Sequence, residues 1–156
     1  MAESTLTRQQ LIDRLNEDLS REYQAIIAYV VYSQALKGPE YMNIAKELQK
    51  HAGEELQHAM KVAKHIDYLG GMPNATPLAV KLSDDARVML RADLDNETET
   101  VRNYTERVQQ AEALHEYAIA EDLREILRDE QEHQIDLATA LGESVPDASH
   151  AERASR

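Results

Sequence analysis

The scarcity of glycine and proline constrains this chain of 156 residues more than any other feature. It has five Gly and four Pro, and neither residue occurs between Asp84 and Leu141. All seven aromatic residues are Tyr, so the bulky residues that favour strands are also scarce. The chain therefore favours an all-α fold of long helices, and its length suits one domain with a sizeable core.

Composition excludes several classes of function. The chain has no cysteine, which excludes a disulfide framework, a zinc ribbon, an iron–sulfur cluster and a thiol nucleophile. A net charge of −12 argues against a nucleic-acid or anionic-membrane partner. The longest apolar run, Ala25 to Tyr32, falls far short of the ~20 residues that a membrane span needs. Because the first residues also lack the pattern of a signal peptide, we expect a cytoplasmic protein with no membrane and no nucleic-acid partner.

Helix-capping residues, together with the helix-breaking residues Gly and Pro, predict where the helices begin and end. Thr7 opens a capping box, and the first helix should run from there to Gly38-Pro39. The second helix follows at once as an antiparallel partner and should end at Gly70-Gly71. Residues 72–82 contain two prolines and are long enough to cross the bundle, so we expect a crossover there. Ser83 is then the expected cap of the third helix.

The long stretch without breakers should contain a hidden turn. Its first half has one heptad phase, carried by Leu90, Leu94, Val101, Tyr104, Val108 and Ala111. Its second half has another, carried by Ala120, Leu123, Leu127, Leu137 and Leu141. We therefore expect a turn within residues 111–116 and a fourth helix that Gly142 ends. Residues 1–142 should form one four-helix bundle with a long crossover between helices two and three, and residues 143–156 a tail without regular structure.

Six polar side chains stand where these helices should be apolar. They are Glu22, Glu55, His58, Glu97, Glu130 and His133. Unpaired carboxylates are costly to bury, and two divalent cations would neutralise four of them charge for charge. Each Glu-x-x-His places both side chains on one helix face, where they can grip one metal. We therefore expect a dinuclear site, whose four glutamates without metal should keep protons above the usual Glu pKa.

The spacing of these residues repeats. Glu22 and Glu55 are 33 residues apart, and so are Glu97 and Glu130. A tyrosine follows the first glutamate of each pair by seven residues, as Tyr29 and Tyr104. The chain thus looks like one helix pair used twice, each pair supplying Glu…Glu-x-x-His.

The repeat also locates the hidden turn. Gly38 follows Glu22 by 16 residues, and the same offset from Glu97 falls on Ala113. A third Glu-x-x-His, formed by Glu112 and His115, lies at this turn and outside the repeat. We interpret it as accidental.

These segments resemble the ferritin-like superfamily, and most closely its bacterioferritin branch, over about residues 11–142. The resemblance rests on the segments REYQAI, EELQHA, GGMPNATPL, MLRADLDNE and EILRDEQEHQIDL. The resemblance implies a crossover four-helix bundle with a dinuclear ferroxidase site that holds two iron ions per subunit. Its ligands would be the six side chains named above, with Glu55 and Glu130 as bridges. Tyr29 matches a tyrosine near the iron pair of bacterioferritins.

The chain departs from that pattern at two places. Leu56 stands where bacterioferritins that carry haem have Met, so we expect no haem. The short fifth helix that helps to close a 24-subunit cage is replaced by a weak tail after Gly142. We expect a homo-oligomer, at least a dimer, and leave a cage open.

The resemblance implies a ferroxidase that oxidises Fe(II) with O₂ or H₂O₂ for iron storage or detoxification. One alternative is a di-iron peroxidase resembling rubrerythrin, which would lack the rubredoxin centre because the chain has no cysteine. Another is a structural bundle with a vestigial metal site. The negative charge disfavours a DNA-protecting mini-ferritin.

Several residues keep two interpretations each. Tyr29 could supply an electron to the iron pair or only bond a ligand carboxylate, and Tyr104 shares this choice. His51 could be an extra ligand or a packed histidine. Glu54 and Asp129 could hand iron inward or belong to a solvated acidic face.

Overall fold

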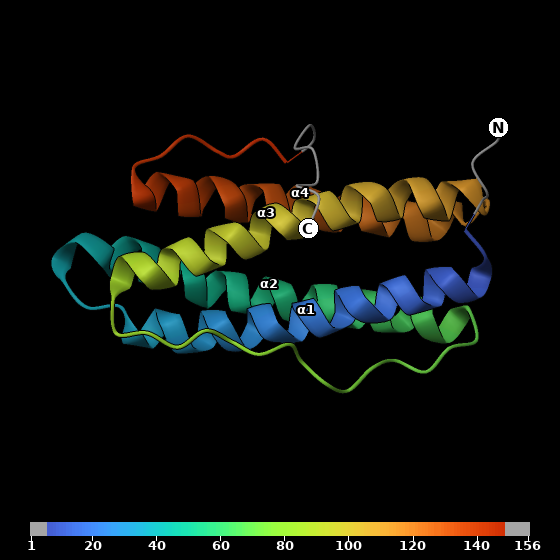
Figure 1. The fold of residues 1–156 in the computed structure, drawn as a ribbon, viewed down its shortest axis with the longest axis horizontal. Coiled ribbons are helices and arrows are strands. Elements are labelled where there is room, and N and C mark those ends of the chain that lie inside the picture. The colour runs from blue at the N-terminus through green and yellow to red at the C-terminus, as the bar shows by residue number, and fades with distance from the viewer. Residues whose placement is uncertain (1–5, 149–156) are drawn as a thin grey trace, which may run out of the picture.

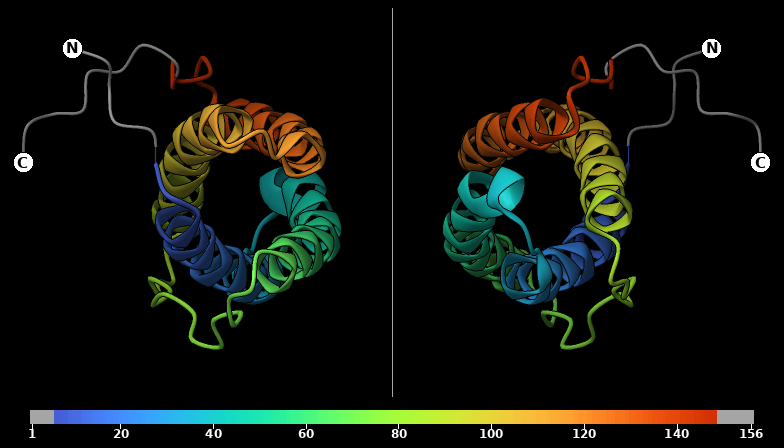
Figure 2. Two further views of the ribbon diagram at one scale, coloured as in Figure 1. Left: turned by 90° about the vertical axis from the view of Figure 1, so that its right-hand side faces the viewer. Right: turned by 90° about the vertical axis from the view of Figure 1, so that its left-hand side faces the viewer.

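The computed structural model describes residues 6–148, and this part forms four long helices that surround a common axis (Figures 1 and 2). In chain order they are α1 (Arg8–Ala35), α2 (Met42–Tyr68), α3 (Ala86–Ala113) and α4 (Tyr117–Leu141), with a short 3₁₀ turn, η1 (Pro39–Tyr41), before α2. The described residues contain no strand, so the predicted all-α four-helix fold is confirmed. None of these helices has both the length and the apolar character needed to cross a membrane.

The chain forms two antiparallel hairpins, α1 with α2 and α3 with α4, and a long crossover joins them (Figure 1). The crossover runs outside the bundle along α1. The Leu78 N–H donates to the Ser20 carbonyl at 3.2 Å, and Gln24 Nε2 donates to the Ala79 carbonyl at 2.8 Å. Because the crossover spans the bundle, α3 begins near the end of α1 and runs antiparallel to it.

The ends of the helices agree with the sequence except at one cap. Thr7 and Gln10 form both bonds of the predicted capping box. The prediction that Ser83 caps α3 is wrong, because the Asp85 carboxylate accepts the Val88 N–H at 3.1 Å and α3 begins after it. Ser83 instead accepts the Asp85 N–H and forms a local turn.

The hidden turn lies where the repeat predicts it. α3 ends at Ala113, and His115 adopts a left-handed conformation with φ of 60°. The Glu116 N–H bonds the Ala111 carbonyl and the His115 N–H bonds the Glu112 carbonyl, both at 2.9 Å. This pattern ends a helix in the way that a glycine usually allows, here without a glycine. Gly142 ends α4 in the same left-handed region, and the chain continues without regular structure to residue 148, while residues 149–156 of the predicted tail lie outside the described part.

The apolar core is divided into two clusters of buried side chains. One includes Leu15, Ile66 and Leu123, and the other includes Leu48, Leu90 and Leu137. In α1, Tyr29 is buried and its neighbour Val30 is exposed. Between the two clusters, all four helices present polar side chains to the interior.

A buried ion pair joins α1 to α3 close to this polar layer. The Arg107 guanidinium lies against the Asp18 carboxylate, with Nε–Oδ2 at 2.7 Å and a second bond at 3.0 Å. Both side chains are buried. Because Asp18 lies one helical turn before Glu22, the pair fixes the register of the two helices that carry Glu22 and Glu97.

We predict that Arg107→Leu lowers the free energy of unfolding by about 3–5 kcal/mol, because it leaves a buried carboxyl without its partner. The double variant Asp18→Leu/Arg107→Leu should recover most of this loss. Arg102→Leu is the matched control, since Arg102 forms a partly exposed pair with Glu99 and should change stability by no more than about 0.5 kcal/mol. Urea unfolding followed by circular dichroism measures all three, and equal losses at Arg102 and Arg107 would contradict the prediction.

Candidate metal centre

The six predicted side chains meet at the middle of the bundle, between the two apolar clusters. Glu22 comes from α1, Glu97 from α3, and one Glu-x-x-His each from α2 and α4. Each of these six residues is no more than 3% exposed. The third Glu-x-x-His, formed by Glu112 and His115, does not join them. Glu112 pairs with Arg124, and His115 is exposed at the turn.

The side chains form two overlapping groups of potential ligands. One group is Glu22, Glu55, His58 and Glu130, and the other is Glu55, Glu97, Glu130 and His133. Within each group, one ligand atom per residue lies within 4.8 Å of the others. Glu55 and Glu130 belong to both groups, so the geometry provides two adjacent positions that share two carboxylates.

The histidines face the shared carboxylates through Nδ1. His58 Nδ1 lies 2.8 Å from Glu130 and 3.1 Å from Glu55. His133 Nδ1 lies 2.7 Å from Glu55 and 3.5 Å from Glu130. Within the described part of the chain, one buried oxygen of Glu22, one of Glu97 and one of Glu130 accept no hydrogen bond. Such a set of unsatisfied buried oxygens is what a bound cation would complete.

The two tyrosines bond the two outer glutamates. The Tyr29 hydroxyl, on α1, donates to Glu97 on α3, and the Tyr104 hydroxyl, on α3, donates to Glu22 on α1. Burial, reinforced by the neighbouring carboxylates, raises the pKa of both hydroxyls well above the usual value, so both remain protonated donors. The repeat thus extends to the contacts that orient Glu22 and Glu97.

In the metal-free centre, the pKa values of the four glutamates shift in two different directions. Burial, followed by the charges of the shared carboxylates, raises the pKa of Glu22 and of Glu97 well above the usual value. Burial has the same tendency at Glu55 and Glu130, but hydrogen bonds from neighbouring acids and both histidines outweigh it and lower these two pKa values. The expectation that all four keep protons is therefore confirmed for the outer pair and wrong for the shared pair.

The histidines supply the compensating charge. Burial tends to lower the pKa of His58 and of His133, but hydrogen bonds to the shared carboxylates outweigh it and raise both. Without metal, the histidines thus pair with the two shared carboxylates, and the raised pKa values of Glu22 and Glu97 favour their protonated forms. Both effects lower the cost of burying this centre.

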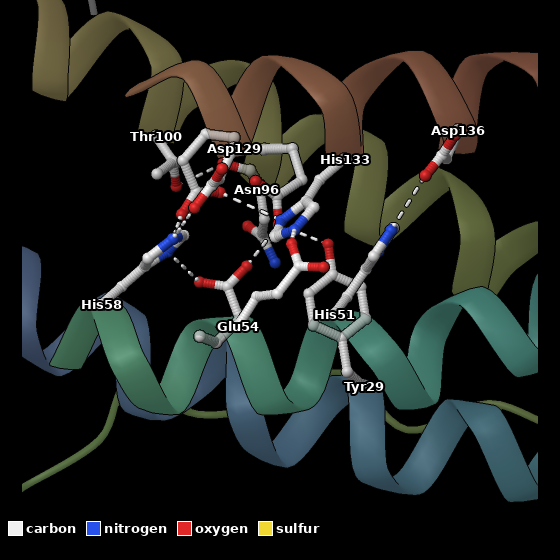
Figure 3. Close-up of polar contacts among 12 residues, drawn as sticks. Tyr29, His51, Glu54, His58, Asn96, Thr100, Asp129, His133 and Asp136 are labelled. Carbon is white, nitrogen blue, oxygen red and sulfur yellow. Dashed lines mark hydrogen bonds and ion pairs between the residues drawn. The ribbon is translucent and has the colours of Figure 1, made fainter. Parts of the chain in front are cut away.

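A line of charged side chains connects this centre to the surface along α2 and α4. His58 Nε2 lies 2.9 Å from Asp129, His133 Nε2 lies 2.8 Å from Glu54, and His51 Nε2 lies 3.0 Å from Asp136 (Figure 3). The ring of His51 also stacks on that of His133, with centroids 4.0 Å apart. A cavity of about 400 Å³ opens here, lined by Glu47, Lys50, His51, Glu54, Asp129, Glu132, His133 and Asp136.

Sequence reasoning missed several of these residues. Asp136 and Glu47 join His51 in a third group of potential ligands, and neither was a candidate. The contact of Asp136 depends on how α2 and α4 are aligned, which one helix cannot reveal, whereas Glu47 stands one turn before His51 on α2 and helix periodicity could have identified it. Asp18 and Asp93 were also missed, although each stands four residues before an outer glutamate and the repeat could have identified them.

The fold and centre define the class: a four-helix bundle with a carboxylate–histidine centre that can hold two metal ions. The ferritin-like domain family matches residues 12–144, so the chain belongs to this family. The bacterioferritin of Brucella melitensis is 29% identical over 140 residues, covering 85% of this chain and 87% of that protein. The bacterioferritin of Streptomyces coelicolor is 29% identical over 143 residues, covering 87% and 86%.

Two solved structures agree with this assignment. A ferritin-like diiron-carboxylate protein from Bacillus anthracis superposes with a TM-score of 0.82 at 34% identity, covering 86% of this chain and 96% of that chain. A dodecameric thioferritin from Bacteroides fragilis, described as bacterioferritin-related, has a TM-score of 0.80 at 26% identity and covers 88% of each chain. The predicted resemblance to the ferritin-like superfamily and its bacterioferritins is confirmed.

We predict that the metal-free protein loses stability as pH rises from about 5 to 8. The outer glutamates and both histidines have raised pKa values when folded, so the native state holds protons that the unfolded chain has released above pH ~4.3 and ~6.5. Each extra proton makes the free energy of unfolding fall by about 1.4 kcal/mol per pH unit. The lowered pKa values of Glu55 and Glu130 act in the opposite sense only below pH ~4.3.

Urea unfolding with a chelator at pH 5.5, 6.5 and 7.5 measures this slope. Glu22→Gln/Glu97→Gln is the control, because glutamine mimics the protonated acid and removes two of the titrating groups. Its slope should be smaller. A wild-type stability that is constant or rises over this range would contradict the assigned protonation states.

Proposed function

We propose that this protein is a ferroxidase that oxidises Fe(II) to Fe(III) with O₂ or peroxide at a dinuclear site within the bundle, for iron storage or detoxification. The observation that carries the proposal is the pair of overlapping ligand groups that share Glu55 and Glu130. The ligands would be Glu22, Glu55 and His58 with Glu97, Glu130 and His133. The bacterioferritins that the chain resembles support iron as the metal.

The residues fit two Fe(II) ions in charge and in chemistry. Carboxylate oxygens with imidazole nitrogen suit Fe(II). Four ionised glutamates and two neutral histidines carry a charge of −4, which two divalent ions balance. Binding would therefore release the protons held by Glu22, Glu97 and both histidines, and it would complete the unsatisfied glutamate oxygens.

The reaction needs two electrons, one from each Fe(II). O₂ takes up both electrons with two protons and becomes H₂O₂, and H₂O₂ takes up two electrons with two protons and becomes two waters. The chain orients the substrate ions through its ligands and excludes water by burial. Tyr29 holds Glu97 through its hydroxyl, and we propose that this bond makes Tyr29 part of the catalytic centre.

The proposal also includes the assembly of the subunits and the compartment in which they act. Ile27 on α1 and Leu56 and Met60 on α2 are between 41% and 64% exposed, so a second copy that covers this hairpin would remove apolar surface from water. The Bacteroides fragilis relative is described as dodecameric. We propose a homo-oligomer, at least a dimer, that acts in the cytoplasm without haem, since Leu56 offers no ligand atom.

We predict that the purified protein binds two Fe(II) per subunit under anaerobic conditions and oxidises both when O₂ is added. Glu55→Gln/Glu130→Gln should slow oxidation by about 100-fold or more, the order lost when one preorganised charged group leaves a catalytic site. Glu112→Gln/His115→Gln is the matched control, because it removes the same motif at the turn and should leave stoichiometry and rate unchanged. Saturation at one metal or none in the wild type would refute the dinuclear site.

Dependence on an electron donor distinguishes storage from peroxide defence. Equal amounts of O₂ and H₂O₂ should be tested against the Fe(II)-loaded protein in stopped flow, with and without an added electron donor. Rapid oxidation of the bound Fe(II) is expected for the ferroxidase without a donor. Repeated reduction of H₂O₂ that requires the donor would favour the di-iron peroxidase, which would need a separate donor because the chain has no cysteine.

We predict that the protein is at least a dimer in solution. Size-exclusion chromatography with light scattering measures the mass directly. Leu56→Glu/Met60→Glu should dissociate the oligomer, because it would bury charge in the interface. A monomeric wild type would contradict the proposed assembly, and a mass of 12 or 24 subunits would support storage in a cage.

A further inference from the structure

Three histidines of α2 stand one heptad apart and face three aspartates of α4 that have the same spacing. Each pair joins Nε2 to a carboxylate oxygen, and the pairs are His51–Asp136 at 3.0 Å, His58–Asp129 at 2.9 Å and His65–Asp122 at 2.7 Å. The middle histidine is one of the six predicted ligands, whereas the outer two are buried without being among them. The roles of the outer two therefore depend on what else each ring contacts.

Of the outer two histidines, His51 is the one that contacts the metal centre. Its ring stacks on the ring of His133, with centroids 4.0 Å apart and planes at 25°. It also meets the ring of Tyr29 edge to face, with centroids 5.2 Å apart and planes at 78°. Tyr29 and His133 are in edge contact with each other at 6.0 Å, so the three rings form one cluster. Because His133 is a predicted ligand and Tyr29 bonds Glu97, His51 packs against one half of the centre.

His51 is itself held in place from the opposite helix. The partly exposed Asp136 carboxylate bonds its Nε2 (Figure 3), while the His51 ring is buried. His51 also lines the charged cavity of about 400 Å³, and the neighbouring Tyr29 is fully buried. A smaller side chain at this position would therefore remove the ring that covers one face of His133.

The second hairpin has no counterpart of this ring. The repeat offset that relates Glu22 to Glu97 places Ile126 at the position that corresponds to His51. The repeat thus supplies a stacked ring to His133 and no matching ring to His58. Loss of the His51 ring should consequently affect one of the two metal positions and not both.

We propose that His51 is a positioning residue that holds the ring of His133 by stacking, in the plane in which Nδ1 faces the shared glutamates. His133 Nδ1 lies 2.7 Å from Glu55 in this orientation. A flat ring packed against its face restricts rotation about the Cβ–Cγ bond, so less order has to be created when a metal binds. This role rests on the proposed function, because it requires metals at the centre.

The competing interpretation is that His51 is itself a metal ligand. Together with Glu47 and Asp136 it forms the third group of potential ligands, with atoms within 4.8 Å of one another. A cation bound there would need a nitrogen lone pair of His51 and would not need its stacking. The two roles therefore differ in what phenylalanine can replace, since it keeps a flat ring but offers no ligand atom.

The test is an anaerobic titration with Co(II), which binds such sites without turnover and reports its ligands by visible absorption. The wild type should bind two Co(II) per subunit. His51→Ala should weaken one of them by about 3- to 10-fold, the range that one lost contact between rings corresponds to, and alter its absorption bands. His51→Phe should recover the wild-type affinity to within about 2-fold, because the stacking is kept. His51→Gln can still bond Asp136 but has no ring, so it should behave like His51→Ala.

His65→Ala is the matched control. His65 is also a buried histidine of α2 whose Nε2 bonds an aspartate of α4, so its loss should disturb the bundle to a similar degree. Among residues 6–148 it stacks on no other ring and joins no group of potential ligands. Both Co(II) affinities should stay within about 2-fold of the wild type, below the effect of a lost ring contact. Circular dichroism and melting of each metal-free variant show whether it folds.

The outcomes separate the two proposals. If the wild type binds fewer than two Co(II), the proposed function fails and the positioning role fails with it. If it binds two and His51→Ala behaves like His65→Ala, the positioning role alone is refuted. If His51→Phe loses as much affinity as His51→Ala, or if the wild type binds a third Co(II) that His51→Phe loses, His51 acts through its nitrogens and the positioning role is refuted as well.

Discussion

The cost of removing carboxylates from water shapes the middle of this bundle. Glu22, Glu55, Glu97 and Glu130 lie within a few ångströms of one another in an interior that water does not reach. Four negative charges could not remain there unpaired. The structure lowers this cost in two ways: raised pKa values favour the protonated forms of the outer two, and the histidines pair with the shared two. In the proposed function, two divalent cations replace the protons, so that one set of side chains serves both states.

The surrounding elements follow from this central layer. The centre contributes little hydrophobic stabilisation, so an apolar cluster on each side must hold the helices together. The crossover is needed because α2 and α3 both run antiparallel to α1, so the chain must return along the whole bundle between them. The buried pair of Asp18 and Arg107 then fixes α1 against α3 one turn from Glu22. A shift of one turn between these helices would separate the outer glutamates from the shared pair.

The sequence revealed the six central side chains because each stands alone in an apolar stripe, and periodicity along one helix is enough to show this. The turn near Ala113 was also predictable, since a change of heptad phase and the repeat both locate it. The error at Ser83 has a local cause: Ser83 and Asp85 both suit a cap, and only the backbone shows which accepts the Val88 N–H. Contacts between helices could not be predicted from the sequence. The bond from His58 to Asp129, for example, depends on the alignment of α2 with α4.

The two helix hairpins match at the predicted ligands, but they differ at the residues next to the ligands. Arg107 holds Asp18, but the residue at the position of Arg107 in the first hairpin is Tyr32, whose hydroxyl bonds the crossover instead of Asp93. Asp93 Oδ2 consequently has no hydrogen-bond partner among residues 6–148, and burial, with the charge of Glu55, raises the pKa of Asp93 well above the usual value. A buried acid whose protonated form is favoured therefore stands one turn before Glu97, where the other hairpin has an ion pair.

The half of the centre that contains Glu97 and His133 also differs from the other half in its access to the surface. His133 lines the charged cavity together with His51, whereas the repeat places Ile126 where His51 would be beside His58. The position between Glu97 and His133 therefore has the buried Asp93 on one side and a charged opening on the other. The position between Glu22 and His58 has the ion pair of Asp18 with Arg107 on one side, and His58 meets the cavity only through Asp129. Two metals bound by matching side chains would thus occupy unequal surroundings.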